Sequence, residues 1–224
     1  MTAITMMTAM TSAPEAGGGA AAPRIDVIVL AGGTAARLGG ASKAEVVARG
    51  ARLLDHILAG LARLAGQGLP VGRVCVVAPA RVALPDGVLR ALEDPPLGGP
   101  VAGIAAGLAR LARQGPAGLT AVLTCDAPES WRALPVLAGC LAPAGARAVG
   151  PAGAVVQDGG HRQYLLGLYR TRALGDAVAP GGVALRDVAV RRALGALDVV
   201  AIPLEGPAAR DLDTWEEIRA WDTP

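Results

Sequence analysis

A glycine-rich loop with two basic side chains follows the apolar run IDVIVL (residues 25–30). The loop reads AGGTAARLGGASK and ends at Lys43, and among the 21 Lys and Arg residues of the chain only Lys43 is a lysine. Glycine lets a backbone approach a phosphate closely, and its N–H group can bind anionic oxygens. An ammonium is a compact charge that can follow a phosphate as its geometry changes, whereas a guanidinium is a planar fork. The pattern predicts a phosphate site; the alternative is a charge on a solvated loop.

The glycine spacing separates this loop from two common nucleotide motifs. It matches neither GxGxxG of dinucleotide-binding domains nor GxxxxGK followed by Ser or Thr, the P-loop pattern. No acidic residue stands at the end of the second apolar run, VCVVA (74–78), where a nicotinamide-binding domain has one about 20 positions on. An oxidoreductase of that kind is therefore disfavoured.

An acidic residue follows the most apolar run of the chain. Asp126 comes directly after LTAVLTC (119–125), where burial of its carboxylate is costly unless a partner compensates the charge. Mg²⁺ is a hard cation that binds carboxylate and phosphate oxygens, so Asp126 is a candidate Mg²⁺ ligand. The alternative is an Asp that begins a turn before Pro128. Asp94, which precedes Pro95, has the same two interpretations.

Apolar runs and amphipathic stretches alternate along the chain. Runs rich in Val, Ile and Leu predict strands, and apolar residues spaced by about 3.6 predict helices. Strands are predicted at 25–30, 74–78, 88–93, 119–125, 153–157, 163–169 and 198–203, and helices around 53–64, 101–111, 130–142, 184–195 and from Thr214 onward, where Thr214 and Glu217 have capping-box spacing. The alternation predicts a three-layer, doubly wound α/β fold whose sheet is mostly parallel with one antiparallel strand.

This fold class would bring the candidate residues together. In doubly wound sheets, ligands bind in the crevice beyond the carboxyl ends of the strands. The loop at 31–43, the segment 94–96 and Asp126 each follow a predicted strand. We therefore expect them at one edge of the sheet.

Composition limits the class of protein. The length suits one domain, which we place at 24–224. Residues 1–23 are predicted to be a disordered extension, because they have neither the basic start of a signal peptide nor the apolar core of a membrane span. Scattered arginines and an aromatic content of 2% argue against nucleic acid as a partner. Three cysteines without a CxxC pair argue against disulfides or zinc and favour the cytoplasm.

The stretch LAGGTAARLGGASKAEV resembles the glycine-rich signature of the MobA-like nucleotidyltransferases, which include the molybdenum cofactor guanylyltransferases. The similarity continues in order through LLDHIL, EDPPLGGPVAGIAAGL, LTCDAP, DGGHRQYLLGLYR and DLDTWEEI, and so covers nearly all of 25–221. The resemblance implies a Rossmann-like sheet of the nucleotide-diphospho-sugar transferase type and a nucleotidyltransferase activity that requires Mg²⁺.

The resemblance also implies roles for individual residues on the nucleotide side. The backbone of the first loop would hold the nucleotide, Arg37 and Lys43 would neutralise its triphosphate as catalytic residues, and Asp94 would lie beside the base or ribose. A second loop would approach the nucleotide at the start of the next helix. The implied nucleotide-binding set is Leu30, Ala31, Gly32, Gly33, Arg37, Lys43, Asp94, Gly99, Pro100 and Gly103. Gly103 could equally serve helix packing alone.

On the metal and acceptor side, the resemblance implies that Asp126 binds Mg²⁺ and that Asp213 is a second ligand. An acid just before a helix is also stabilised by the helix dipole, which is the structural alternative for Asp213. Arg162 and Gln163 would contact the acceptor. The specific expectation is transfer of GMP from GTP to the phosphate of molybdopterin, with transient contact to other cofactor-biosynthesis proteins or molybdoenzymes and none to membranes.

Departures from the family pattern keep other functions open. Ser42 stands where the family commonly has an acid before the lysine. The family's apolar segment after DxP is replaced by Glu129, Ser130 and Trp131, which could alter the acceptor pocket. The terminal pattern TPED is replaced by TWEE. The alternatives are a relative that uses CTP or a sugar, alditol or lactyl phosphate acceptor, and a degenerate, non-catalytic nucleotide-binding protein.

Overall fold

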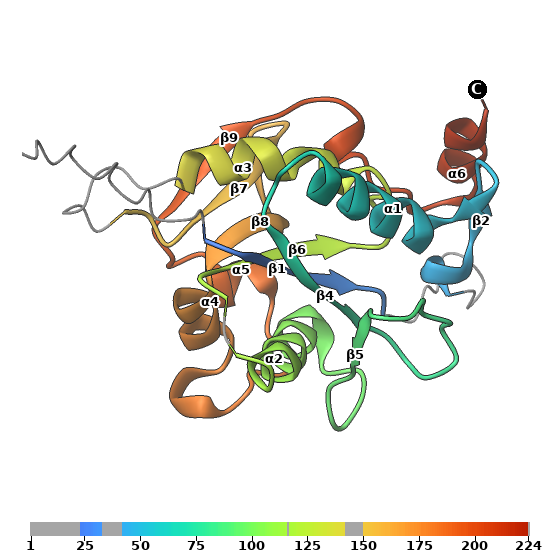
Figure 1. The fold of residues 1–224 in the computed structure, drawn as a ribbon. Coiled ribbons are helices and arrows are strands. Elements are labelled where there is room, and N and C mark those ends of the chain that lie inside the picture. The colour runs from blue at the N-terminus through green and yellow to red at the C-terminus, as the bar shows by residue number, and fades with distance from the viewer. Residues whose placement is uncertain (1–22, 33–41, 116, 142–149, 224) are drawn as a thin grey trace, which may run out of the picture.

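A computed structural model describes residues 23–32, 42–115, 117–141 and 150–223. In these residues, seven strands form one sheet in the order β5-β4-β1-β6-β8-β7-β9, in which β8 runs antiparallel to both neighbours and the other neighbouring pairs are parallel (Figure 1). The strands are β1 (Ile25–Leu30), β4 (Val71–Val77), β5 (Leu89–Ala91), β6 (Leu119–Thr124), β7 (Gly153–Asp158), β8 (His161–Arg170) and β9 (Val199–Pro203). The predicted α/β fold, mostly parallel with one antiparallel strand, is confirmed.

Helices cover both faces of this sheet. The α-helices are α1 (Leu53–Gly66), α2 (Gly99–Ala112), α3 (Leu134–Leu141), α4 (Thr171–Val178), α5 (Val190–Leu194) and α6 (Trp215–Asp222), and the short 3-10 helices are η2 (Lys43–Glu45), η3 (Ser130–Ala133), η4 (Pro180–Gly182) and η5 (Pro207–Ala209). Figure 1 shows α1 and α3 on one face and α2, α4 and α5 on the other. No helix of the described segments is long and apolar enough to cross a membrane.

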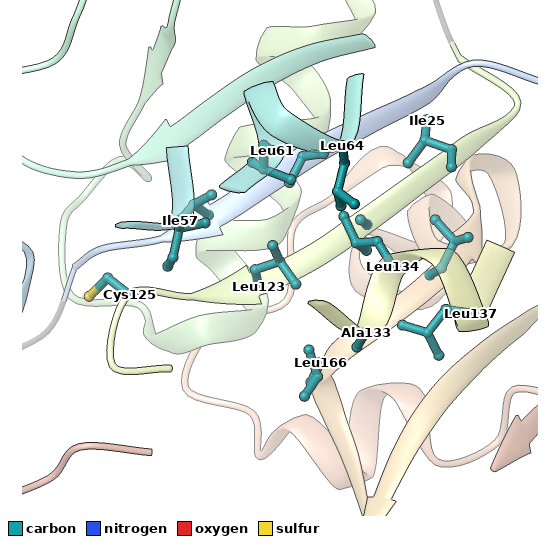
Figure 2. Packing of buried hydrophobic residues seen from close by; sticks show 14 of the residues in the cluster. Ile25, Ile57, Leu61, Leu64, Leu123, Cys125, Ala133, Leu134, Leu137 and Leu166 are labelled. Atoms are coloured by element: carbon teal, nitrogen blue, oxygen red, sulfur yellow. The ribbon is translucent and has the colours of Figure 1, made fainter. Parts of the chain in front are cut away.

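The core follows from the alternation of side chains along β1. Val27 and Val29 pack in the cluster beneath α1 and α3, whereas Ile28 and Leu30 pack in the cluster beneath α2, α4 and α5. Both faces of the strand are buried, as expected for a central parallel strand. Figure 2 shows part of the first cluster, in which Leu64 of α1 points toward Leu134 of α3.

Three elements differ from the sequence-based expectation. The helix predicted around 184–195 is confined to α5, and α4 was not predicted at all. A two-residue hairpin, β2 (Val47–Ala48) with β3 (Ala51–Arg52), was also missed. Its turn uses Arg49 and Gly50, both at positive φ, and only the glycine signals such a turn in a sequence.

Two glycines of α1 differ in what surrounds them, which gives a test of the packing. A methyl group on Gly60 would overlap the ring of Trp131, whereas one on Gly66 would meet no atom within 4 Å. We expect Gly60→Ala to lower the free energy of unfolding by about 1–3 kcal/mol through overpacking. Gly66→Ala should raise it by about 0.5 kcal/mol, because alanine favours the helix. Urea unfolding of both variants measures the difference, and equal effects would contradict the packing of Trp131 on α1.

Candidate active site

Lys43 lies between two acidic side chains that are distant in sequence. It begins η2, and its ammonium donates a hydrogen bond to Asp126 Oδ2 at 3.0 Å and another to Asp213 Oδ1. Asp126 follows β6 directly, and Asp213 precedes α6. The side chains of Lys43, Asp126 and Asp213 are 18%, 27% and 44% exposed, so the cluster is partly shielded yet open to a ligand. The predicted phosphate-binding lysine and both predicted metal ligands thus meet at the carboxyl edge of the sheet.

Main-chain hydrogen bonds hold the segments that carry these side chains. The N–H of Cys125 donates to the carbonyl of Leu30 at 3.0 Å, which ties the end of β6 to the end of β1. The N–H of Leu212 donates to the carbonyl of Asp126 at 2.8 Å. The C-terminal segment is therefore fixed directly beside the loop after β6.

The start of α6 fixes Asp213. Thr214 and Glu217 form the predicted capping box, and the carboxylate of Glu217 also accepts a hydrogen bond from the N–H of Asp213 at 2.8 Å. The hydrogen bond from the N–H of Asp213 and, to a lesser extent, the bonds from Thr214 lower the pKa of Glu217. They keep its carboxylate ionised. The cap thus orients the backbone from which Asp213 reaches Lys43.

The charge of Lys43 is held by its acidic partners. Burial alone would lower the pKa of this lysine, because a charged ammonium loses solvation. The hydrogen bond to Asp213, together with the charge and hydrogen bond of Asp126, outweighs burial and raises the pKa above its ordinary value. The side chain is therefore a permanent cation at neutral pH.

Asp211 is a further acid at this site that the sequence did not single out. Its pKa is raised to about 6, first because the surrounding protein removes water from its carboxyl group, although part of the residue reaches solvent, and then because Asp126 and Asp213 repel a further negative charge. The motif DLDT contained the signal, since Asp211 is two residues from Asp213.

This shift predicts a pH-dependent stability. A carboxyl group whose folded pKa is raised contributes stability that is present below its unfolded pKa and is lost as the pH rises through the folded value. Asp211→Asn should therefore gain about 1 kcal/mol over wild type between pH 4 and pH 7, after allowance for solvent screening. Urea unfolding with a metal chelator present measures this gain, and a difference that does not vary with pH would refute the assignment.

The first loop is described only in part. Arg37 and Gly33 lie outside the described residues. The N–H of Ala31 donates to the carbonyl of Val77 at 3.0 Å, and the carbonyl of Leu30 accepts from Cys125, so these main-chain groups serve the sheet. Gly32 is exposed and follows them. The main-chain contacts predicted for this loop stay predictions: the N–H of Ala31 is already used by Val77 in this conformation, whereas Gly32 is accessible.

The second loop leads into α2, where glycines serve two different purposes. Gly99 has φ of 83°, a conformation that side chains disfavour, so a glycine is required at the helix start. A methyl group on Gly103 would lie 3.2 Å from Leu30, so this glycine allows α2 to approach β1 closely. Pro100 and Asp94 are exposed near the same loop. The packing interpretation of Gly103 therefore has direct support.

A basic side chain also lies against this loop. The guanidinium of Arg186 would be 2.7 Å from a methyl group on Gly98, and the N–H of Asp187 donates to the carbonyl of Gly98 at 2.9 Å. Sequence reasoning missed Arg186, because one arginine in an irregular segment carries no signal.

The proposed acceptor residues lie at the first positions of β8. Arg162 is paired with Gln157 and Gln163 with Val156 of β7. Since β8 runs antiparallel to β6 and lies next to it, these residues are at the edge where β6 ends at Asp126. Arg162 is exposed and Gln163 half-buried.

The departures at 129–131 serve packing. The ring of Trp131 lies on α1 at Gly60, and Glu129 forms an ion pair with Arg132 at 2.9 Å. Glu129 also accepts a hydrogen bond from the indole of Trp221 at 3.4 Å. These contacts join η3 to α1 and α6. Glu129 and Trp131, whose departure from the family pattern could alter the acceptor pocket, therefore have a structural role.

A metal ion at this site would have carboxylate ligands. Asp126 and Asp213 already converge on one cation, the ammonium of Lys43, so their oxygens fit a hard divalent cation. The described residues contain no group of three or more His, Cys, Asp and Glu side chains arranged to hold a metal. Mg²⁺ commonly uses one or two carboxylates together with water and substrate phosphates, and this donor set fits that pattern.

The chain resembles known proteins in sequence and in fold. The model of the MobA-like NTP transferase domain matches residues 27–200, and no curated protein matches the sequence. Rv0371c from Mycobacterium tuberculosis H37Rv is 19% identical, with a TM-score of 0.62 over 90% of this chain and 99% of that one. The 2-C-methyl-D-erythritol 4-phosphate cytidylyltransferase from Thermus thermophilus is 16% identical, with a TM-score of 0.55 over 87% and 96%. The CMP:2-keto-3-deoxy-manno-octonic acid synthetase solved with CTP is 12% identical, with a TM-score of 0.61 over 89% and 96%. At these identities, the likeness shows a shared fold.

Proposed function

Because the chain belongs to the MobA-like NTP transferase family, whose members are nucleotidyltransferases, we propose that it transfers GMP from GTP to the phosphate of molybdopterin in a reaction that requires Mg²⁺. The observation that carries this proposal is the meeting of Lys43, Asp126 and Asp213 at the carboxyl edge of the sheet. That edge is where doubly wound folds bind their ligands.

The chemistry needs positioning and charge neutralisation. A phosphate oxygen of the acceptor attacks the α-phosphorus of the nucleotide, and pyrophosphate leaves with the electrons of the broken bond. Lys43 and Arg37 would offset the growing negative charge on the leaving pyrophosphate. Asp126 and Asp213 would hold Mg²⁺, which when bound supplies positive charge to the phosphate oxygens.

The two loops would hold the nucleotide. Gly32 and Gly33 offer close approach to phosphates, and the start of α2 at Gly99 and Pro100 would lie beside the base or ribose, together with Asp94. Arg162 and Gln163 would contact the acceptor from β8. Residues 24–224 would act as one catalytic domain.

Another donor or acceptor is the nearest alternative. Two of the similar structures are named for cytidylyl chemistry, which is a specific reason to test CTP. Sugar, alditol and lactyl phosphates are the corresponding acceptors. A degenerate protein that binds a nucleotide without turnover is the alternative from another class, suggested by Ser42 in place of the usual acid.

A panel of substrates tests the proposal. The purified protein is incubated with GTP, CTP, ATP or UTP and with molybdopterin or one of the other phosphorylated acceptors, and pyrophosphate release is measured with Mg²⁺ and with a chelator. We expect release with GTP and molybdopterin only when Mg²⁺ is present. If CTP were the only nucleotide to give pyrophosphate release, CTP and not GTP would be the donor. Nucleotide binding without pyrophosphate release in every combination would favour the degenerate, non-catalytic alternative.

A further inference from the structure

The ammonium of Lys43 occupies the place between the two carboxylates that the proposed metal would need. Its hydrogen bonds to Asp126 and Asp213 join residues 83 and 170 positions away in the sequence. We infer that Lys43 is an internal placeholder cation, which holds both carboxylates until a metal–nucleotide complex arrives and then moves to the triphosphate. This inference rests on the proposed function for the identity of the incoming metal and nucleotide.

Electrostatics gives the placeholder its purpose. The carboxylates of Asp126 and Asp213 carry like charges that repel each other, and the ammonium of Lys43 contacts an oxygen of each. A cation between them offsets this repulsion and holds both side chains in place. Lys43 supplies that cation from within the chain, so the site is preformed before a metal binds.

Geometry makes the two cations exclude each other. The Lys43 nitrogen is 3.0 Å from Asp126 Oδ2. A Mg²⁺ ion that bridged the same two oxygens would need the space that the ammonium fills, so the ammonium would have to leave when the ion enters. The anionic oxygens of a nucleotide give the displaced ammonium a new partner. Metal and nucleotide should therefore bind together far better than the metal alone.

The same argument accounts for two features of the sequence. A lysine has a flexible stem and a compact charge, so it can change partners more readily than the planar guanidinium of arginine. Ser42, which precedes the lysine, makes no capping hydrogen bond from its side chain to η2. The acids that hold the lysine come from the loop after β6 and the segment before α6.

Metal binding without nucleotide tests the inference directly. Electron paramagnetic resonance measures the affinity of Mn²⁺ for the wild-type protein, for Lys43→Met and for the double variant Lys43→Met with Asp126→Asn. We expect Lys43→Met to bind Mn²⁺ at least about tenfold more tightly than wild type, because a competing positive charge has been removed. The double variant should lose that gain, which would assign the new affinity to Asp126. Equal or weaker binding by Lys43→Met would overturn the inference.

The single lysine permits a second measurement on the unaltered protein. Protein labelled with ¹³C-lysine should give one set of side-chain NMR signals, from Lys43. We expect the Cε signal of the wild-type protein to shift when GTP and Mg²⁺ are added together. In Asp126→Asn without ligands, we expect the signal to lie close to the position that it reaches in the liganded wild-type protein. A signal that stays unchanged while Mg²⁺ and GTP saturate the protein would contradict the exchange.

The two proposals can fail separately. The Mn²⁺ affinities need no nucleotide and no turnover, so an inactive substrate panel would remove the proposed function and leave these affinities to decide the placeholder. The converse result is that the wild-type protein turns over with Mg²⁺ while Lys43→Met binds Mn²⁺ no more tightly than wild type. That result would support the proposed function and contradict the placeholder role of Lys43. Thermal unfolding of each variant establishes that the metal affinities are measured on folded protein.

Discussion

Replacing Lys43 with alanine is expected to lower the turnover number for pyrophosphate release by at least about a thousandfold. The reason is that the proposed reaction gathers negative charge on the leaving pyrophosphate, and removal of a preorganised cation from such a site costs this order of magnitude. The measurement is steady-state pyrophosphate release at saturating nucleotide and Mg²⁺, with the active substrates from the panel. Folding should be retained, since Lys43 belongs to the short η2 and not to the core.

Lys43→Arg is the matched control. It keeps the charge but replaces the compact ammonium with a planar fork, so we expect a turnover number between those of Lys43→Ala and wild type. Full turnover in Lys43→Ala would contradict the catalytic role. A loss accompanied by a large fall in melting temperature would instead assign Lys43 a structural role through Asp126 and Asp213.

Asp126→Asn should have an effect of similar size, with a different dependence on metal. Asn has nearly the same shape, so the fold should persist, but it lacks the negative charge that attracts Mg²⁺. We expect turnover to fall by about a thousandfold and the Mg²⁺ concentration for half-maximal rate to rise. Asp213→Asn should cause a smaller loss, because its carboxylate is more exposed than that of Asp126.

Asp176→Asn provides the comparison for this series. Asp176 is on α4, and its side chain is 78% exposed with a distant ion pair to Arg172 at 3.8 Å. Its replacement should leave both the rate and the Mg²⁺ requirement unchanged, because exposed pairs of this kind contribute little. If Asp126→Asn behaved like Asp176→Asn, Asp126 would not be a metal ligand.

Much of the fold could be predicted because it depends on local patterns. The strand at 25–30 is rich in β-branched residues and is buried on both sides, and the spacing of Thr214 and Glu217 predicted the capping box. The extra helix α4 was missed because it contains Gly175 and has only a short apolar stripe, Leu174 and Val178, against the sheet. Its position depends on packing with α2, which no local pattern specifies.

The candidate site shows the same division. Lys43 and Asp126 were found because each follows a strand, and parallel strands end at one edge. The direct pairing of Lys43 with Asp213 could not be foreseen, since it depends on the hydrogen bond from Leu212 that brings the C-terminal segment beside Asp126. The use of Trp131 was likewise hidden, because it depends on the space left by Gly60 on another helix.

The hydrogen bond between Leu212 and Asp126 also shows that residues beyond the family match belong to the site. The family match stops at residue 200, whereas Leu212, Ile218 and Trp221 form a small apolar cluster with Val46 and Leu53, on either side of the hairpin that follows Lys43. A chain shortened to the matched region would keep most of β1 but only the first two residues of β9, and it would lose the carboxylate of Asp213 and the hydrogen bond from Leu212 to the loop after β6. The segment that carries Asp211, Leu212 and Asp213 is thus part of the site, and exchanging it between relatives would show how far it determines which substrates the enzyme accepts.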